Sequence, residues 1–286
     1  MQTVILGAQG QLGGVLHRHA RRAGLDWTGQ GRRAGADVIW SLQDKPAEAV
    51  FPENGTIINM IGYAGPDEDA LQQANIDATD RILTLAKAHG VAHVILASSA
   101  AVYGNAGTAP ITEEAPLSPL TPYADSKVRM EALAQAAAGV AGSPAITILR
   151  IGNVAGSDAL TTIARRRIAA GAAMDLHRFA DGTAPVRSYI GPRDLFDVVA
   201  ALAPQPPAAI RTVNVAAPDP VPLDHVMTAY KTHVLPDLVW QDAPAPDSVP
   251  KRVILSIQAL RALVDLPSAS DYATHMARQV QEDISP

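Results

Sequence analysis

Short apolar runs alternate with amphipathic stretches through the first half of this sequence. The runs cover residues 4–6, 25–28, 38–40, 56–61, 93–98 and 145–151, and Gly, Asn or Ser bounds most of them. Runs this short and continuously apolar are typical of strands covered on both faces. Between them, apolar residues recur at three- and four-residue spacings, most clearly over residues 69–89, which predicts helices. Alternation of this kind indicates right-handed crossovers and a parallel sheet.

The alternation of predicted strands and helices becomes less regular after Ile151. Proline-rich stretches occur at residues 203–207, 218–222 and 243–250, and the predicted helices (160–170, 193–202, 223–233, 256–263 and 272–282) no longer alternate with strands. We therefore expect an α/β protein with a Rossmann-type doubly wound parallel sheet and a smaller, partly helical C-terminal substrate lobe. The sheet domain is expected to comprise residues 1–155 and about 186–217, and the lobe about 156–185 and 218–286.

Composition narrows the classes of function. Apolar residues make up 48% of the chain, the net charge is −5, and no basic stripe suggests nucleic-acid binding. The absence of cysteine excludes disulfides and thiolate catalysis, and the histidines lack metal-ligand spacing, so we expect no metal site. No apolar stretch is long enough for a membrane span, and a strand beginning at residue 3 leaves no room for a signal peptide. We expect a soluble, cytoplasmic protein.

A glycine-rich turn follows the first predicted strand and opens a helix. It reads Gly7-Ala8-Gln9-Gly10-Gln11-Leu12-Gly13. The first glycine allows a tight turn, the second lets backbone N–H groups approach a pyrophosphate, and the third lets the helix pack closely on the strand. The sequence therefore predicts a dinucleotide site that includes Gly7, Gly10, Gln11, Leu12 and Gly13.

Cofactor choice in such sites is read at the end of the second strand. An acidic residue there would hydrogen-bond the ribose 2′-OH of NAD, but residues 28–33 read Thr-Gly-Gln-Gly-Arg-Arg. Arg32 and Arg33 could pair with a 2′-phosphate instead. We therefore expect NADP as the cofactor and leave NAD open.

A tyrosine and a lysine four residues apart, Tyr123 and Lys127, share one face of a predicted helix. A cation beside a phenol lowers the phenol's pKa, and the same ammonium can donate to a nicotinamide ribose. The preceding strand ends in two hydroxyls, the second being Ser99, in the region where open α/β sheets bind ligands. These residues are candidates for acid–base chemistry on a bound substrate.

The order of these motifs resembles the extended short-chain dehydrogenase/reductase family, often called NAD-dependent epimerase/dehydratase proteins. The segments that carry the resemblance are residues 74–79, 97–104, the Tyr-x-x-x-Lys of 123–127, 149–156, 181–190 and 211–215. The resemblance implies that Ser99 binds and polarises the substrate oxygen, that Tyr123 is the general acid/base, and that Lys127 tunes Tyr123 and holds the ribose. It also implies that Asn153 and Arg187 line the substrate pocket.

The resemblance adds further cofactor contacts, namely Ser41, Leu42, Gly62, Ala97, Tyr123, Lys127 and Ile151. Two positions depart from the family pattern. Ser41 stands where the family often has Asp, and residues 59–62 (Asn-Met-Ile-Gly) replace a His-Leu-Ala-Ala motif while keeping a small residue toward the cofactor.

The leading functional expectation is an NADP(H)-dependent reductase or dehydrogenase that acts on a sugar-like or hydroxy-ketone substrate. The family's dehydratases follow the serine with Asp-Glu, where this chain has Ala100 and Ala101, so dehydration lacks its acid and base. A nucleotide-sugar epimerase with tightly bound NAD is the alternative, and a non-catalytic NADP-sensing regulator is a second one.

The role of Arg187 depends on the substrate. A phosphate-bearing substrate would take it as a ligand, whereas a small uncharged substrate would leave it as a structural partner of an acidic neighbour. The small lobe favours the second option. Beyond a small molecule we expect neither nucleic-acid nor membrane partners, and a homodimer stays open.

Overall fold

The computed structural model describes residues 2–45, 48–105, 107, 109–266 and 268–284. The chain forms two compact units. The first comprises Met1–Gly104, Pro116–Ile151 and Phe196–Asn214, and the second comprises Asn105–Ala115, Gly152–Leu195 and Val215–Pro286. The division falls inside helix α6 (Pro192–Leu202), so the polypeptide passes from one unit to the other within a helix.

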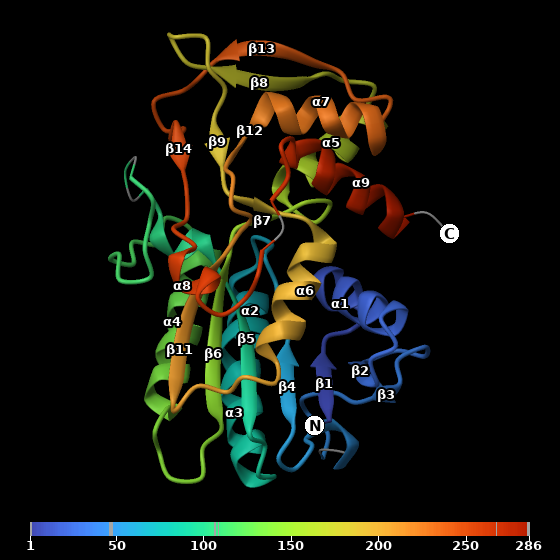
Figure 1. Cartoon of the computed structure of the whole chain (residues 1–286), viewed down its shortest axis with the longest axis vertical. Helices are drawn as coiled ribbons and strands as arrows, with labels where there is room; N and C mark the ends of the chain where they lie inside the picture. Colours follow the sequence, from blue (N-terminus) through green and yellow to red (C-terminus); the bar gives the residue numbers. More distant parts are fainter. Residues whose placement is uncertain (1, 46–47, 106, 108, 267, 285–286) are drawn as a thin grey trace. The chain divides into compact units, whose positions relative to one another are not determined.

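A seven-stranded sheet organises the first unit (Figure 1). Its order is β11-β6-β5-β4-β1-β2-β3, and the pairings from β6 through β3 are parallel. The strands are β1 (Thr3–Leu6), β2 (Trp27–Gly31), β3 (Val38–Ile39), β4 (Thr56–Asn59), β5 (His93–Ser99), β6 (Ala145–Ile151) and β11 (Ile210–Val215). The sheet confirms the predicted doubly wound Rossmann-type architecture, because the strand order reverses direction at β1 and β4.

Helices cover both faces of this sheet. They are α1 (Gln11–Arg22), α2 (Glu68–Leu71), α3 (Ala78–Ala88), α4 (Pro122–Ala137) and the end of α6. One core cluster joins Ile57, Leu96 and Ile148 of the strands to Ile82 of α3 and Met130 of α4. On the other side, the Phe196 ring stacks on His19 of α1. No helix within the described residues is both long and apolar enough to cross a membrane.

Two local features differ from the sequence prediction. The second strand begins at Trp27 rather than at residue 25 and runs to Gly31, because its polar Gln30 and two glycines are buried inside the sheet. The helix expected over residues 69–89 is interrupted by a π-helical segment, η2 (Gln72–Asp77), between α2 and α3. Such π segments are frequent at functional sites.

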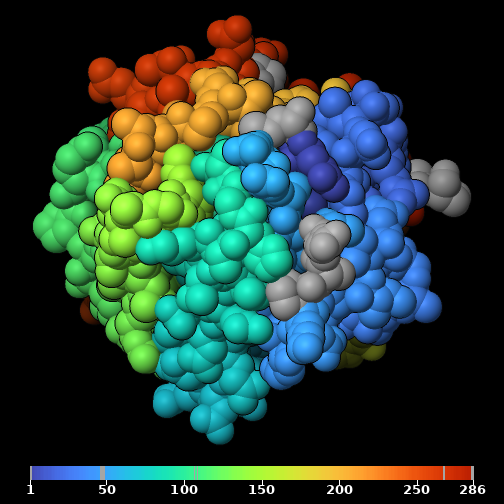
Figure 2. Space-filling model, turned by 90° about the horizontal axis from the view of Figure 1, so that it is seen from below, coloured from blue at the N-terminus to red at the C-terminus, as the bar shows by residue number. Residues whose placement is uncertain are grey.

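The two ends of the sheet carry different parts of the chain. Figure 2 shows the end at which the chain enters the strands, where segments from the first half of the chain cover much of the surface. The turn after β1, the end of β2 and the end of β5 all lie at the opposite, carboxyl end. In open α/β sheets ligands bind at that end.

The second unit is smaller and partly helical, as predicted, and its strands are short. It contains α5 (Ala159–Ala169), α7 (Leu223–His233), α8 (Gln258–Arg261) and α9 (Tyr272–Ile284). Its short strands pair as β10 (Tyr189–Ile190) with β7 (Asn153–Val154), as β12 (Val221–Pro222) and β14 (Arg252–Val253) on either side of β9 (Val186–Arg187), and as β13 (Trp240–Pro244) with β8 (Met174–Arg178). Its own apolar core includes Met174, Tyr189, Val226, Tyr230 and Met276.

Candidate functional site

The turn between β1 and α1 has the geometry of a phosphate-binding loop. Gly7 has a φ of +79°, in the left-handed region that favours glycine. A Cβ on Gly13 would lie 2.2 Å from the Gly7 carbonyl oxygen, so only glycine lets α1 pack this close to the turn. The Gly10 N–H donates to the same carbonyl oxygen at 2.9 Å. The three predicted glycines therefore shape one tight turn at the start of α1.

The N-terminus of α1 is left open by the side chains around it. Its N-cap is a glycine without a capping side chain, and its first turn, which contains Gln11 and Leu12, has no acidic residue. By contrast, side-chain oxygens of Asp67, Thr121 and Asp158 cap α2, α4 and α5. Uncapped N–H groups at the positive end of a helix dipole form an anion site. This arrangement fits the pyrophosphate of a dinucleotide.

A buried glutamine in β2 fixes the turn from below. Gln30 is 2% exposed, and its Oε1 accepts from the Gly7 N–H at 3.0 Å. Its Nε2 donates to the Trp40 carbonyl oxygen at 2.5 Å. One side chain thus ties the phosphate loop to the chain after β3. Gln30 was not among the predicted site residues, because the sequence placed it after the second strand, which was expected to end at residue 28.

The end of β2 is covered by a side chain from the phosphate loop. The Gln9 Oε1 accepts from the N–H groups of Arg32 (3.1 Å) and Arg33 (3.0 Å), and its Nε2 donates to the Arg33 carbonyl oxygen at 2.9 Å. A Cβ on Gly31 would lie 2.5 Å from the Gln9 carboxamide, so the glycine makes room for it. The side chains of Arg32 and Arg33 are exposed. A neutral amide therefore stands at the position where the sequence analysis looked for an acid.

Two of the expected cofactor contacts, Ser41 and Leu42, follow β3. The Ser41 hydroxyl donates to Gln43 Oε1 at 2.6 Å, and the Ser41 N–H donates to Asp44 Oδ2 at 3.2 Å. Leu42 packs against the core of the first unit. Ser41 is thus held in a local turn, and a cofactor contact of either residue stays a prediction.

Ser99, Tyr123 and Lys127 come together at the carboxyl end of the sheet. Ser99 ends β5, where its hydroxyl caps the short helix η3 (Ala100–Tyr103) by accepting from the Ala101 N–H at 3.2 Å. Tyr123 lies in the first turn of α4, whose start is set by the Thr121 cap and a proline at N1. Ser99 hydrogen-bonds the Tyr123 phenol. Lys127 lies one turn further along α4, with its Nζ 6.0 Å from the centre of the Tyr123 ring.

Burial acts on both ionisable groups of this cluster. It raises the pKa of Tyr123, although the hydrogen bond from Ser99 opposes the shift. Burial lowers the pKa of Lys127 to about 8, and the negative charge of Glu131 opposes that shift. Lys127 therefore carries a proton at pH 7 and loses it in mildly alkaline solution. A neighbouring ammonium stabilises the phenolate form of a tyrosine by charge attraction.

Three further predicted cofactor contacts are Ala97, Gly62 and Ile151. The first two lie beside the Lys127 ammonium, and the third ends β6. Its Nζ donates to the Ala97 carbonyl oxygen at 2.9 Å. A Cβ on Gly62 would lie 3.3 Å from the same Nζ and 3.0 Å from Asn75 Oδ1, so a small residue is needed there. Ile151 is buried at the end of β6, next to Ser99 in the sheet register.

Asn75 organises the loop after β4 from the π-helical segment. Its Nδ2 donates to the Tyr63 carbonyl oxygen (2.9 Å) and to Ser126 Oγ (2.8 Å), and its Oδ1 accepts from the Tyr63 N–H at 3.0 Å. This buried amide connects the loop that contains Gly62 with the helix that contains Lys127. The sequence marked Asn75 only by the resemblance.

The two predicted substrate ligands lie in the second unit. The Asn153 Nδ2 donates to the Ser188 carbonyl oxygen at 3.2 Å, between β7 and β10. The Arg187 Nη1 donates to the Val186 carbonyl oxygen at 2.9 Å, and burial lowers the pKa of its guanidinium. Within the described part of the chain no carboxylate pairs with Arg187, so the acidic neighbour that a structural role requires is missing.

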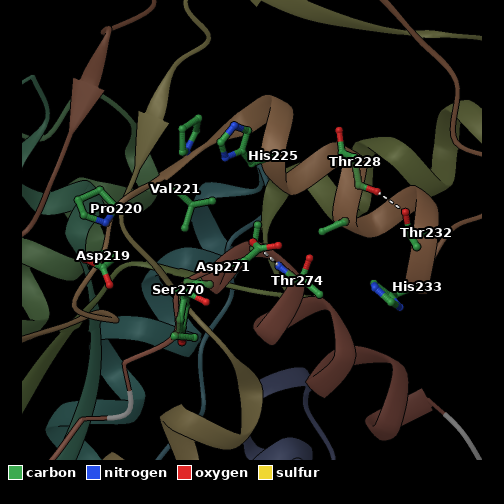
Figure 3. Close-up of a pocket in the computed structure, with 15 residues that line it drawn as sticks. Asp219, Pro220, Val221, His225, Thr228, Thr232, His233, Ser270, Asp271 and Thr274 are labelled. Atoms are coloured by element: carbon green, nitrogen blue, oxygen red, sulfur yellow. Dashed lines mark hydrogen bonds between the residues drawn. The ribbon is translucent and has the colours of Figure 1, made fainter.

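A separate cavity of about 660 Å³ lies in the second unit between α7 and the segment that leads into α9 (Figure 3). Its lining includes His225 and His233 of α7, and Asp271 opposite them. Among the described residues, no group of three or more His, Asp or Glu side chains could hold a metal ion. Neither predicted substrate ligand lines this cavity.

Comparison with known proteins decides the family. The model of the NAD-dependent epimerase/dehydratase family matches residues 3–216, which contain the glycine turn, the end of β5 and the Tyr123–Lys127 helix. The chain belongs to this family. The family assignment confirms the resemblance seen in the sequence and makes the protein an enzyme of the extended short-chain dehydrogenase/reductase type.

Relatives of this family member share short segments or the fold. The UDP-glucose 4-epimerase of Dictyostelium discoideum is 34% identical over 102 residues, which span 33% of this chain but only 29% of that protein. MoeE5, solved in complex with UDP-glucuronic acid and NAD, has a TM-score of 0.80 at 20% identity, with 98% of both chains covered. The UDP-N-acetylglucosamine 4-epimerase of Methanobrevibacter ruminantium M1 has a TM-score of 0.79 at 17% identity, with 98% of this chain and 97% of that chain covered.

These comparisons favour NAD, which the sequence left open beside NADP. The family is NAD-dependent and MoeE5 binds NAD, so NADP as the primary cofactor is not supported. The physical reason lies at the end of β2. The sequence showed no acid there and left two arginines as the only visible recognition groups, whereas the structure adds the Gln9 carboxamide from another element.

Proposed function

We propose that this protein is an NAD-dependent epimerase of a nucleoside diphosphate sugar, with Tyr123 as its acid/base. The observation that carries the proposal is Arg187, a half-buried cation that no carboxylate pairs with in the described part of the chain. A buried cation without a partner is unfavourable unless an anion binds it. A diphosphate supplies that anion, and Arg binds phosphate in a bidentate geometry.

The names of the relatives support the same substrate class. The Dictyostelium protein is a UDP-glucose 4-epimerase, and MoeE5 was solved with UDP-glucuronic acid. The proposal therefore takes the alternative of the sequence analysis in place of its leading reductase. Asn153 and Arg187 are proposed substrate ligands.

NAD is the proposed cofactor, held by the uncapped N-terminus of α1 and by the turn of Gly7 and Gly10. When bound, NAD would take up and later return the hydrogen and two electrons of a sugar carbon. The Gln9 carboxamide lies at the end of β2, where a carboxylate usually binds a ribose hydroxyl, and its Oε1 accepts from the N–H groups of Arg32 and Arg33. Gln9 is therefore proposed to shape the end of β2 for the ribose of NAD without adding a charge there. The Lys127 ammonium is proposed to hold the second ribose.

Epimerisation needs a group that removes a hydroxyl proton and then returns it. Tyr123 is proposed to accept this proton at its phenolic oxygen, while Ser99 orients the sugar oxygen and Lys127 stabilises the phenolate. Ala100 and Ala101 follow Ser99 in η3, so the chain has no acid there to expel water. The same residues therefore favour epimerisation over dehydration.

The experiment is a product analysis. Purified protein is supplied with NAD and one of a panel of UDP-sugars, and the mixture is followed by anion-exchange chromatography and proton NMR. The proposal expects an epimer of one UDP-sugar with no net change in absorbance at 340 nm. Steady oxidation of NADPH with a hydroxy-ketone, and no epimer from any sugar, would instead establish the reductase.

A further inference from the structure

A network of buried polar side chains lies next to the acid–base residues and takes no part in the proton transfer proposed above. Ser98 Oγ donates to Glu131 Oε1 at 2.5 Å, and the Arg150 guanidinium donates to both Glu131 oxygens at 2.8 to 3.2 Å. The Arg150 Nη1 donates to the Tyr103 hydroxyl at 2.9 Å, which donates to Asn214 Oδ1 at 2.7 Å. All five side chains are at most 4% exposed.

This network connects β5 and α4, the two elements that carry the acid–base residues. On α4, Lys127 and Glu131 are one turn apart, and both reach the last residues of β5. The Lys127 Nζ donates to the Ala97 carbonyl oxygen, and the next residue, Ser98, donates to Glu131. Side chains alternate along a strand, so Ser98 points to α4 from the residue directly before Ser99. The two bridges set where Ser99 lies relative to Tyr123.

Glu131 also supplies charge. The Lys127 ammonium is 4% exposed, and its hydrogen bonds go to the Ala97 carbonyl oxygen and the Met130 sulfur, not to a carboxylate. Tyr123 faces it from the same helix. Glu131 is the negative group that acts on Lys127, and Arg150 of β6, beneath the Tyr103 ring of η3, binds that carboxylate from the far side.

The remaining elements against α4 add no buried charge. In α2, η2 and α3 the charged residues are Glu68, Asp69, Asp77, Asp80, Arg81 and Lys87, and all six are exposed. In η2 the buried polar group that reaches α4 is the neutral Asn75 amide. The charge state of Lys127 is therefore set by burial, which favours the neutral amine, and by Glu131, which favours the ammonium.

We propose that the buried Glu131–Arg150 pair is a positioning device of the active site, which holds the end of β5 against α4 and keeps a proton on Lys127. The inference rests on the proposed function only in that Lys127 serves the site as an ammonium. Glu131 is a positioning residue because it acts through Lys127 and Ser98. Arg150 neutralises Glu131 enough for the carboxylate to remain buried.

The alternative is a pair that serves stability alone. A buried ion pair is weak evidence for stability, and replacing both partners by neutral residues is often tolerated, whereas removing one partner is costly. A stability role therefore predicts changes in melting temperature without any change in the titration of Lys127. The charge role predicts that the titration moves, in a direction that depends on which partner is removed.

The test measures the pKa of Lys127 directly, without cofactor or substrate. The protein has five lysines, so ¹³C-lysine labelling gives few Cε resonances, and the Lys127 resonance is the one that Lys127→Met removes. Its chemical shift is followed from pH 6 to 11 in the unmodified protein and in Glu131→Gln, Arg150→Met and the double variant. Ser98→Ala is the matched control, because it breaks a bond to Glu131 without changing a charge.

The proposal expects Glu131→Gln to lower the Lys127 pKa by about one unit, the size of effect that one nearby charge has. The double variant, which leaves no unpaired buried charge, should lower it by less, and Arg150→Met should not lower it. Ser98→Ala should leave it unchanged. An unmoved Lys127 pKa in Glu131→Gln would overturn the proposal. If that variant does not fold, an unmoved pKa in the double variant decides the matter in the same way.

A second readout connects the pair to the cofactor. If Lys127 must be an ammonium to hold the ribose, NAD affinity measured by calorimetry should fall above about pH 8, and the fall should begin at lower pH in the double variant. Unchanged NAD profiles would contradict the inference even if UDP-sugar epimerisation were found. Shifted profiles in a protein without epimerase activity would leave the inference standing and refute the proposed function.

Discussion

Lys127 lies beside Tyr123 without hydrogen-bonding its phenol. The Lys127 Nζ is 6.0 Å from the centre of the Tyr123 ring, and it donates to the Ala97 carbonyl oxygen at 2.9 Å and to the Met130 sulfur at 3.9 Å. The lysine can therefore stabilise a phenolate through space while its third N–H remains able to donate to a cofactor. Ser99, which hydrogen-bonds the phenol, is the group proposed to orient the substrate oxygen.

Tyr123→Phe should lower kcat at least 100-fold, because acid–base groups typically contribute factors of this size. It removes only the ionisable oxygen, so the dissociation constant for NAD should change less than threefold or so. Steady-state kinetics and calorimetry on the same preparation check the two halves. The matched control is Tyr63→Phe, outside the acid–base cluster. Retention of a tenth of the activity by Tyr123→Phe would exclude Tyr123 as the acid/base.

His93 should make the protein acid-sensitive. Its ring lies buried in β5 between the Ala203 carbonyl oxygen (3.1 Å) and Thr147 Oγ1 (2.9 Å), and burial lowers its pKa from 6.5 to about 4. Above pH 6.5 the histidine is neutral in both states. Between pH 6.5 and 4 only the unfolded chain takes up the proton, so stability is lost as the pH falls through this window.

The loss should amount to about 2–3 kcal/mol, and urea unfolding at several pH values measures it. His93→Gln should flatten the dependence between pH 6.5 and 4 while lowering stability at pH 7. His233→Gln, a half-exposed histidine of the second unit, is the control and should leave the curve as it is. An equally steep curve in His93→Gln would show that other groups cause the acid sensitivity.

NAD should bind more tightly than NADP. Because Arg32 and Arg33 are exposed and the Gln9 amide covers the end of β2, replacing both arginines by Ala should change the NAD dissociation constant by less than about threefold. Gln9→Ala should weaken NAD about 10-fold, the effect of one or two hydrogen bonds. Isothermal calorimetry with both dinucleotides checks this. A tighter constant for NADP that Arg32→Ala/Arg33→Ala abolishes would restore the original reading of β2.

Arg187→Ala should weaken binding of UDP about 10- to 100-fold, in line with about 1.5–3 kcal/mol for a hydrogen bond to a charged group. Its melting temperature should not fall, because the substitution removes a buried cation that no carboxylate compensates in the described part of the chain. The control is Arg178→Ala. Arg178 pairs with Asp224 and Asp242 in the same unit, so its loss should lower the melting temperature and spare UDP binding. The reverse pattern would make Arg187 structural.

The motifs that depend on local spacing could be predicted from the sequence. Gly7, Gly10 and Gly13 follow one strand and open one helix, so their roles in a tight turn are visible in the order of residues. Tyr123 and Lys127 share a helical face for the same reason, and Ser99 ends the preceding strand. In each case a single element or a single turn fixes the geometry, and the structure has the three acid–base candidates together.

The parts that depend on contacts between elements could not be predicted in this way. Gln30 reaches Gly7 from a neighbouring strand, Gln9 covers the end of β2 from the phosphate loop, and Glu131 meets Ser98 and Arg150 from α4. The sequence shows them only as polar residues, Gln9 in a glycine-rich turn, Gln30 after the predicted second strand and Glu131 on a predicted helix, and it does not name their partners. The NADP expectation rested on residues 28–33 alone and took no account of Gln9.

The central claim is that one carbon of a nucleotide sugar is oxidised and reduced again within a single bound complex. The direct measurement uses UDP-glucose deuterated at C4, with no added reductant and only stoichiometric NAD. We expect UDP-galactose that retains the deuterium at C4, detected by mass spectrometry and proton NMR. Tyr123→Phe should form no such product. A product that exchanges the label with solvent, or net accumulation of NADH with a keto sugar and no epimer, would contradict it.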